Sequence, residues 1–190
     1  MKWATKKRVR VKQKLKEFKE TRGVESLFLL IFCIILSLYV KDVNAGECKF
    51  KQQLTPYQKD IMEIAYRHGE EYDLGLTTVA IAWKESKLGL YNVRYNRSNI
   101  NDQSFGVLHT VARWKTKNMS PFEAGMWVEN MITSPEYSIQ EGVKDIIYWQ
   151  KRAKGDWFKG VGMYNGGNIP NKNYAESITS IVRELKHCEF

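Results

Sequence analysis

Apolar residues recur at helical spacing through most of the chain after Leu54, and the alternation typical of strands is rare. Capping residues divide this pattern into segments, because Ser or Thr before Pro, or before a glutamate three positions later, marks a helix start. Residues 91–105 are rich in Asn, Tyr and Ser, which predicts an irregular stretch or a small hairpin. The sequence therefore predicts a mainly α protein (α+β class), a compact single helical domain with at most a small hairpin. The expected helices cover residues 55–72, 77–86, 106–115, 134–149, 156–164 and 174–186, and another begins at Ser120.

The helix at the centre of this pattern lies within residues 76–90. We expect Thr77 or Thr78 to cap its start and Gly89 to follow its end. Glu85 lies near that end beside apolar neighbours, and such surroundings disfavour the charged form of a carboxyl group. A carboxylic acid that keeps its proton at neutral pH can donate it to a leaving oxygen. The alternative interpretation is a solvated glutamate between two lysines on the helix surface.

The N-terminal segment has the three parts of a secretory signal sequence. Residues 1–25 hold ten Lys and Arg, residues 27–40 carry no charge, and small residues around Ala45 suit a signal peptidase. The uncharged run has 14 residues, which is short for a membrane-spanning helix of about 20. We therefore divide the chain into residues 1–45, a basic n-region with a hydrophobic signal peptide or signal anchor, and an exported domain, residues 46–190. Both kinds of signal place the domain outside the inner membrane, periplasmic or secreted, with membrane contact through the N-terminal segment before or without cleavage.

Positive charge is concentrated in the same N-terminal segment. Residues 1–45 hold 11 of the 30 Lys and Arg but 4 of the 21 Asp and Glu, and so contribute +7 of the net charge of +9. This distribution is typical of an addressing signal. It argues against a nucleic-acid partner, which needs a basic surface on the folded domain.

Export also gives the cysteines an interpretation. Cys33 lies in the apolar run, so the exported domain keeps Cys48 near its start and Cys188 near its end. In an oxidising compartment these two thiols can pair and join the ends of the domain. The alternative is two unpaired thiols.

Four short motifs follow one another in the exported domain. They are Glu85-Ser86, residues 103–109 (QSFGVLH), residues 163–167 (MYNGG) and Tyr174. As an ordered set in a helical background, they resemble the lytic transglycosylase branch of the lysozyme-like superfamily. Members of that branch show Glu-Ser, Ser-x-Gly-Leu-Met-Gln, Ala-Tyr-Asn-x-Gly and a later Tyr. The resemblance covers about residues 54–185, although each motif alone is common.

The resemblance implies an enzyme that cleaves the β-1,4 bond between N-acetylmuramic acid and N-acetylglucosamine in peptidoglycan. Glu85 would be the single catalytic acid and later the base. Ser104 would hold its carboxyl group, and the Tyr174 hydroxyl would lie beside it. The substrate-binding residues implied in the same way are Tyr164, Asn165, His109, Gly106 and Val107.

One carboxyl group is enough for this reaction, although most glycosidases use two. A 2-acetamido sugar can supply the nucleophile through its own carbonyl oxygen. In a transglycosylase the 6-hydroxyl of muramic acid then attacks and leaves a 1,6-anhydro end without use of water. Because this oxygen is already close, no entropy is lost in bringing in a nucleophile. The reaction implies no metal and no cofactor.

Two positions depart from the pattern of the family or extend it. His109 stands where the family has a glutamine that helps to hold the N-acetyl group, and histidine titrates near neutral pH. Asp102 lies on the approach to the second motif, in a region where goose-type lysozymes use an aspartate to position water. The alternative for Asp102 is an ordinary Asn-Asp turn.

Two other functions remain open at this stage. A hydrolytic muramidase, goose-type or a phage endolysin, would use Asp102 and give reducing ends. A cell-wall binding or scaffold protein would keep the fold without activity. We expect a monomer that acts on peptidoglycan strands, in wall remodelling, in secretion or conjugation, or in phage lysis.

Overall fold

The structure is a computed structural model that describes residues 48–190. The predicted signal, Cys33 and the domain boundary after Ala45 lie outside the described residues. Residues 48–190 belong to one compact unit. Within residues 48–190, no helix has the length and apolar character needed to cross a membrane.

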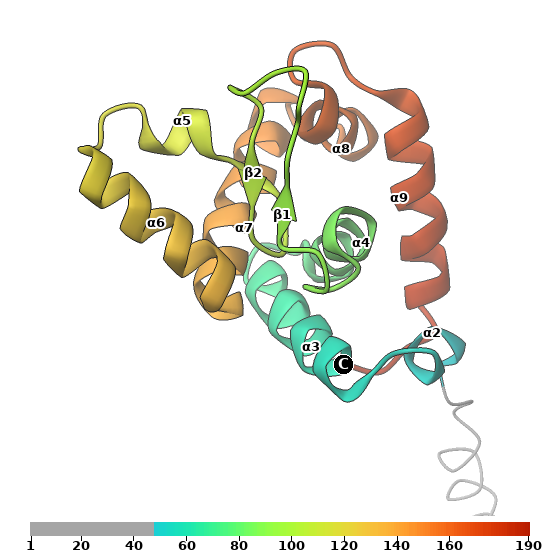
Figure 1. Cartoon of the computed structure of the whole chain (residues 1–190). Helices are drawn as coiled ribbons and strands as arrows, with labels where there is room; N and C mark the ends of the chain where they lie inside the picture. Colours follow the sequence, from blue (N-terminus) through green and yellow to red (C-terminus); the bar gives the residue numbers. More distant parts are fainter. Residues whose placement is uncertain (1–47) are drawn as a thin grey trace, which may run out of the picture. The chain divides into compact units, whose positions relative to one another are not determined.

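The described residues form eight helices and one small sheet, which confirms the predicted mainly α class (Figure 1). Strands β1, β2 and β3 are antiparallel neighbours in that order. Ser104 of the central strand pairs with Arg94 on one side and with Val111 on the other. The elements in chain order are α2 (Lys49–Gln52), α3 (Pro56–Glu70), α4 (Gly75–Ser86), β1 (Val93–Arg94), β2 (Ser104–Phe105), β3 (Thr110–Val111), α5 (Ala112–Thr116), α6 (Pro121–Thr133), α7 (Pro135–Arg152), α8 (Trp157–Gly166) and α9 (Lys172–Leu185).

Helices that open with a clear capping signal begin where the sequence predicts. Helix α3 begins after Thr55, whose side chain and that of Gln58 form a reciprocal capping box. Helix α6 begins after Ser120 with the same arrangement to Glu123. These side chains accept hydrogen bonds from backbone N–H groups that the first helical turn leaves without partners.

The helix predicted to begin after Gly106 and run to about Lys115 forms only from Ala112 onward. Gly106 and His109 both have left-handed backbone, with φ of 80° and 49°. Two such residues within four positions are incompatible with a right-handed helix. The segment instead makes a turn, strand β3 and the short helix α5.

The predicted cap of the central helix is also wrong. Helix α4 begins two residues before Thr77, with Leu74 at the cap and no side-chain cap bond. The Thr78 hydroxyl donates within the helix to the Leu74 carbonyl, and Thr77 accepts from the Trp157 indole at 2.9 Å. Both threonines thus serve packing and not capping. The helix ends at Ser86, three residues before Gly89.

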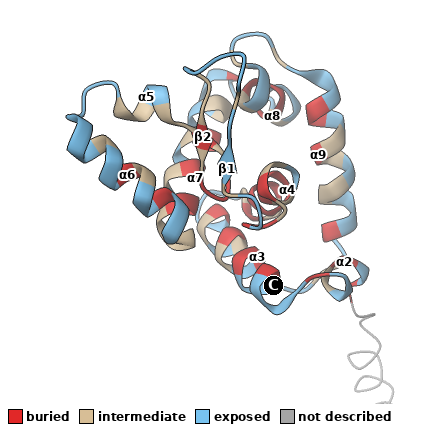
Figure 2. Ribbon diagram, in the orientation of Figure 1, coloured by how far each residue is buried: buried red, intermediate tan, exposed pale blue. Residues whose placement is uncertain are grey.

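Helix α4 is the centre of the core. Four successive residues, Val79 to Ala82, have no exposed surface. A helix that is buried on every face must be surrounded by others, and α4 packs against α3 and α9 (Figures 1 and 2). Small residues permit close packing, since a Cβ on Gly69 of α3 would lie 2.3 Å from the Thr78 hydroxyl. The backbone of α4 is therefore held in place from several sides.

The two ends of the domain are joined by the predicted disulfide between Cys48 and Cys188, which the structure confirms. Their Cα atoms are 4.8 Å apart across a sequence separation of 140 residues. Nearby, the ring of Phe190 stacks on Tyr66 of α3. The C-terminal end of α9 is thus fixed to the start of the domain.

Loss of this bridge is expected to destabilise the domain strongly. In the chain-entropy account, a loop of this length contributes about 4–5 kcal/mol to the free energy of unfolding. We expect Cys48→Ser, Cys188→Ser and the double variant to melt about 15 °C below the wild type, as followed by circular dichroism. Cys33→Ser is the control and should melt as the wild type does in oxidising buffer. Equal melting of all four variants would argue against a stabilising bridge.

Candidate active site

Glu85 lies in the last turn of α4, and 12% of its side chain is exposed. The helix stops abruptly one residue later. Lys87 and Leu88 both have φ of 54°, and Gly89 follows with φ of 81°. The buried Ser86 hydroxyl holds this turn, because it donates to the Ala82 carbonyl and accepts from the Gly89 N–H at 2.8 Å. The end of the helix, and with it the position of Glu85, is therefore firmly defined.

Tyr174 contacts one oxygen of this carboxyl group. Its hydroxyl donates to Glu85 Oε1 at 2.6 Å, which is the position the sequence predicts for it. The residue belongs to the first turn of α9, where the Asn171 side chain caps the helix by accepting from the Tyr174 N–H. Burial, and then the neighbouring carboxylate, raise the pKa of Tyr174 well above its usual range. The phenol therefore remains a neutral donor.

Tyr164, on α8, holds the 106–109 turn beside the site. Its hydroxyl donates to the Leu108 carbonyl at 2.5 Å. Burial is the main cause that raises the Tyr164 pKa well above its usual range, and Glu85 adds to it. Asn165, the next residue, is exposed and accepts from the Asn171 amide at 2.8 Å. Tyr164 thus ties α8 to the 106–109 turn, while Asn165 is available at the surface.

The turn 106–109 is pressed against α7. A Cβ on Gly106 would lie 2.6 Å from the Ser138 Cβ. The Val107 N–H donates to the Ser138 hydroxyl at 3.2 Å, and the Val107 side chain is fully buried in the core. The substrate contacts predicted for Gly106 and Val107 can therefore involve only their main chain.

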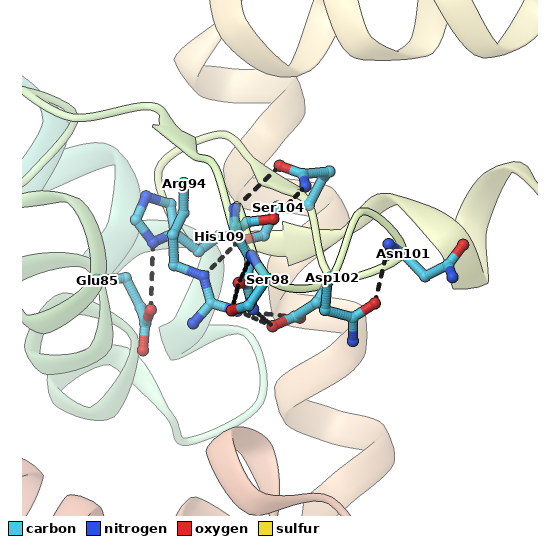
Figure 3. Close-up of polar contacts among 10 residues, drawn as sticks. Glu85, Arg94, Ser98, Asn101, Asp102, Ser104 and His109 are labelled. Atoms are coloured by element: carbon cyan, nitrogen blue, oxygen red, sulfur yellow. Dashed lines mark hydrogen bonds and ion pairs between the residues drawn. The ribbon is translucent and has the colours of Figure 1, made fainter.

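His109 ends this turn with its ring directed at Glu85 (Figure 3). Its Nδ1 lies 3.3 Å from Glu85 Oε2, and 7% of its side chain is exposed. Its Nε2 lies 2.7 Å from the Tyr91 carbonyl oxygen. The approach of Nδ1 to Oε2 is within ion-pair distance but is not aligned as a hydrogen bond, and Nδ1 has no other polar partner in residues 48–190. Sequence reasoning placed His109 at the N-acetyl group and missed this contact with the carboxyl group.

Ser104 is fully buried, but its hydroxyl does not hold Glu85 as predicted. It accepts from Arg94 Nε at 3.2 Å. The same guanidinium donates through Nη2 to both oxygens of Asp102, at 3.0 and 3.1 Å. Asn96 adds a further bond to Asp102 at 2.9 Å. The contacts of Ser104 therefore stabilise the β1–β2 loop through Arg94, a residue that the sequence analysis did not single out.

Within residues 48–190, no group of His, Cys, Asp and Glu is suited to hold a metal ion. Two surface hollows, of about 580 and 930 Å³, are lined mainly by α3, by the start of α4 or by the C-terminal end of the chain, and Glu85 lines neither. Glu85, Tyr174 and His109 form the candidate site.

Comparison with protein-family models, with curated proteins and with solved structures gave no match. The functional interpretation therefore rests on the four motifs and on the geometry around Glu85.

The turn that carries His109 should depend on the absence of a side chain at Gly106. Alanine there would have to adopt φ of 80° and would overlap Ser138. We expect Gly106→Ala to lower the free energy of unfolding by about 2–4 kcal/mol, measured by urea denaturation.

Gly125→Ala is the matched control for this substitution. Gly125 lies inside α6, and no neighbouring atom lies near the position that a Cβ would take. Alanine there should therefore raise the free energy of unfolding by about 0.5–1 kcal/mol. A Gly106→Ala protein as stable as the wild type would mean that the turn does not need its left-handed glycine.

Proposed function

We propose that residues 46–190 form an exported lytic transglycosylase that cleaves the β-1,4 bond between N-acetylmuramic acid and N-acetylglucosamine. The observation that carries this proposal is a single, nearly buried carboxyl group, Glu85, held between a phenol and an imidazole. Its helix, α9 and the 106–109 turn supply three of the four motifs, and α8 supplies the fourth. A site of this kind suits a reaction that needs one proton donor and no charged nucleophile.

In the first step Glu85 acts as the acid. Its proton passes to the glycosidic oxygen, which leaves as the 4-hydroxyl of N-acetylglucosamine. The N-acetyl carbonyl oxygen of muramic acid attacks C1 and supplies the electron pair. Tyr174 donates to Oε1 and stabilises the carboxylate that forms, because hydrogen bonds to a charged acceptor are stronger than neutral ones.

In the second step the same carboxylate acts as the base. The 6-hydroxyl of muramic acid attacks C1 and displaces the acetamido oxygen. Its proton passes to Glu85, which restores the starting state, and a 1,6-anhydro end is formed. No water is consumed, so the site needs no second carboxylate to orient water.

The hydrogen bonds of Asp102 favour transglycosylation over hydrolysis. Its carboxylate accepts hydrogen bonds from Arg94 and from Asn96. Both oxygens of this carboxylate are thus already engaged within the β1–β2 loop. We therefore assign Asp102 to the support of the β1–β2 loop.

Glu85→Gln should abolish cleavage and keep the fold, because it removes the proton and preserves the shape. We expect a loss of about 10²–10⁴-fold in the release of soluble fragments from purified peptidoglycan. Glu63→Gln, an exposed change on α3, is the matched control and should retain full activity. Substantial activity in Glu85→Gln would exclude the mechanism.

The products should identify the reaction by mass. Muropeptides that are one water lighter than their hydrolytic counterparts, with anhydromuramic ends, are expected from mass spectrometry of the digest. Reducing ends would instead establish a hydrolytic muramidase and bring Asp102 into the mechanism. A folded protein without products would favour a wall-binding protein.

Tyr174→Phe should slow cleavage without abolishing it. It removes one hydrogen bond to the carboxyl group, which is worth about 1.5–3 kcal/mol when the acceptor is charged. The expected loss is about 10–100-fold in kcat, with KM nearly unchanged. Tyr72→Phe, at an exposed tyrosine after α3, serves as the control. A rate equal to that of the wild type would show that the phenol contributes nothing to the reaction.

A further inference from the structure

We propose that His109 is a positioning residue that shares one proton with Glu85, so that the pair holds the proton used in cleavage. The catalytic consequence rests on the proposed function, whereas the shared proton can be tested without activity. The contact between Nδ1 and Oε2 carries the inference.

The protonation of the His109 ring is fixed on one side. Nε2 lies 2.7 Å from the carbonyl oxygen of Tyr91. A carbonyl oxygen only accepts hydrogen bonds, so Nε2 must carry the hydrogen in every protonation state of the ring. In the neutral imidazole, Nδ1 therefore has a lone pair.

The main chain keeps the ring in this orientation. The His109 N–H donates to the Gly106 carbonyl, and the residue adopts left-handed backbone that only a tight turn stabilises. Gly106 in turn is packed against Ser138 of α7. The direction of Nδ1 thus follows from the fold and not from a freely rotating side chain.

On its other side, Nδ1 faces the carboxyl group. It is buried 3.3 Å from Glu85 Oε2 and has no other polar partner among the described residues. With no proton present, a lone pair and a carboxylate oxygen would face each other in a site shielded from water, which is unfavourable. One proton, on Oε2 or on Nδ1, removes this repulsion, and this is the proton that the two groups share in the proposal.

The other groups around the pair remain neutral or are engaged elsewhere. Tyr174 of α9 faces Oε1, and Tyr164 of α8 lies next to it. Both have a pKa raised above its usual range, chiefly by burial. Asp145 of α7, whose charge also raises the pKa of Tyr164, is paired with Lys115.

The two lysines next to Glu85 on its own helix also have other contacts. Lys84 donates to the Ser177 hydroxyl, and Lys87 lies over the Trp83 ring. The polar groups that contact the Glu85 carboxyl group in the described residues are therefore the imidazole and the Tyr174 phenol.

Over the reaction cycle, the pair gives up one proton and regains one. The one-proton pair gives its proton to the leaving oxygen and is left as carboxylate and neutral imidazole. The 6-hydroxyl of muramic acid then returns one proton to Glu85. The glutamine of the family cannot take up a proton at this position. In this chain, His109 would therefore let the pair keep its proton, and thus its activity, at a higher pH.

The first test is the pH profile of kcat/KM for the full chain on purified peptidoglycan, between about pH 4.5 and 8.5. His109→Gln keeps an amide donor but cannot titrate. We expect the alkaline limb of its profile, scaled to its own maximum, to lie at a pH lower by about one unit or more than that of the wild type. His109→Ala should show the same displacement and a lower rate throughout, since it also loses the hydrogen bond to Tyr91.

His68→Gln is the matched control. His68 also contacts a glutamate, Glu136, through Nε2, but it lies on α3 and outside the site. Its profile should coincide with that of the wild type. A His109→Gln profile that is lowered equally at every pH, with no displacement, would overturn the proposal and leave His109 a purely structural residue.

The second test uses ¹⁵N NMR of the His109 ring and needs no substrate. We expect the Nε2 resonance to remain that of a protonated nitrogen, while Nδ1 takes up its proton at a lower pH in Glu85→Gln than in the wild type. Identical titration of Nδ1 in the two proteins would overturn the shared proton. If the wild type cleaves no peptidoglycan at any pH, the proposed function fails, and the NMR result alone decides the shared proton.

Discussion

The burial of α4 on all sides is the constraint on which the rest of the structure depends. Because Val79 to Ala82 have no exposed surface, neighbouring helices must cover every face of this helix, and a charged residue can be accommodated only at its end. Glu85 occupies that end, where the consecutive left-handed residues 87–89 turn the chain away. The packing of the core around α4 therefore also determines where the Glu85 carboxyl group lies.

The two oxygens of this carboxyl group have different surroundings, supplied by segments that are distant in the sequence. A phenol from α9 reaches Oε1, and an imidazole from the turn after β2 faces Oε2. The sheet is small, yet it fixes where that turn begins, since Ser104 is its central position and Gly106 closes against α7. Residues from three of the four motifs, Glu85, His109 and Tyr174, thus meet at one carboxyl group.

The sequence predicts those features that depend on local chemistry. Capping boxes at Thr55 and Ser120 mark helix starts because they satisfy N–H groups within a few residues. The pairing of Cys48 with Cys188 follows from their number and positions. Side-chain orientation is different, since it depends on tertiary contacts. Nothing local indicates that the Ser104 hydroxyl bonds to Arg94, or that the ring of His109 turns toward Glu85. The helix predicted after Gly106 failed for a related reason, because apolar periodicity does not reveal left-handed backbone at a residue such as His109.

If the chain is exported as proposed, the disulfide has a consequence for the order in which the domain is completed. A polypeptide that crosses a membrane from its N-terminal side delivers Cys48 early and Cys188 among its last residues. The bridge can therefore close only when translocation of the domain is complete. Closure fixes the end of α9, the helix whose first turn holds the Tyr174 phenol against Glu85. In that case the bridge forms in the oxidising compartment beyond the membrane, since thiols stay reduced in the cytoplasm.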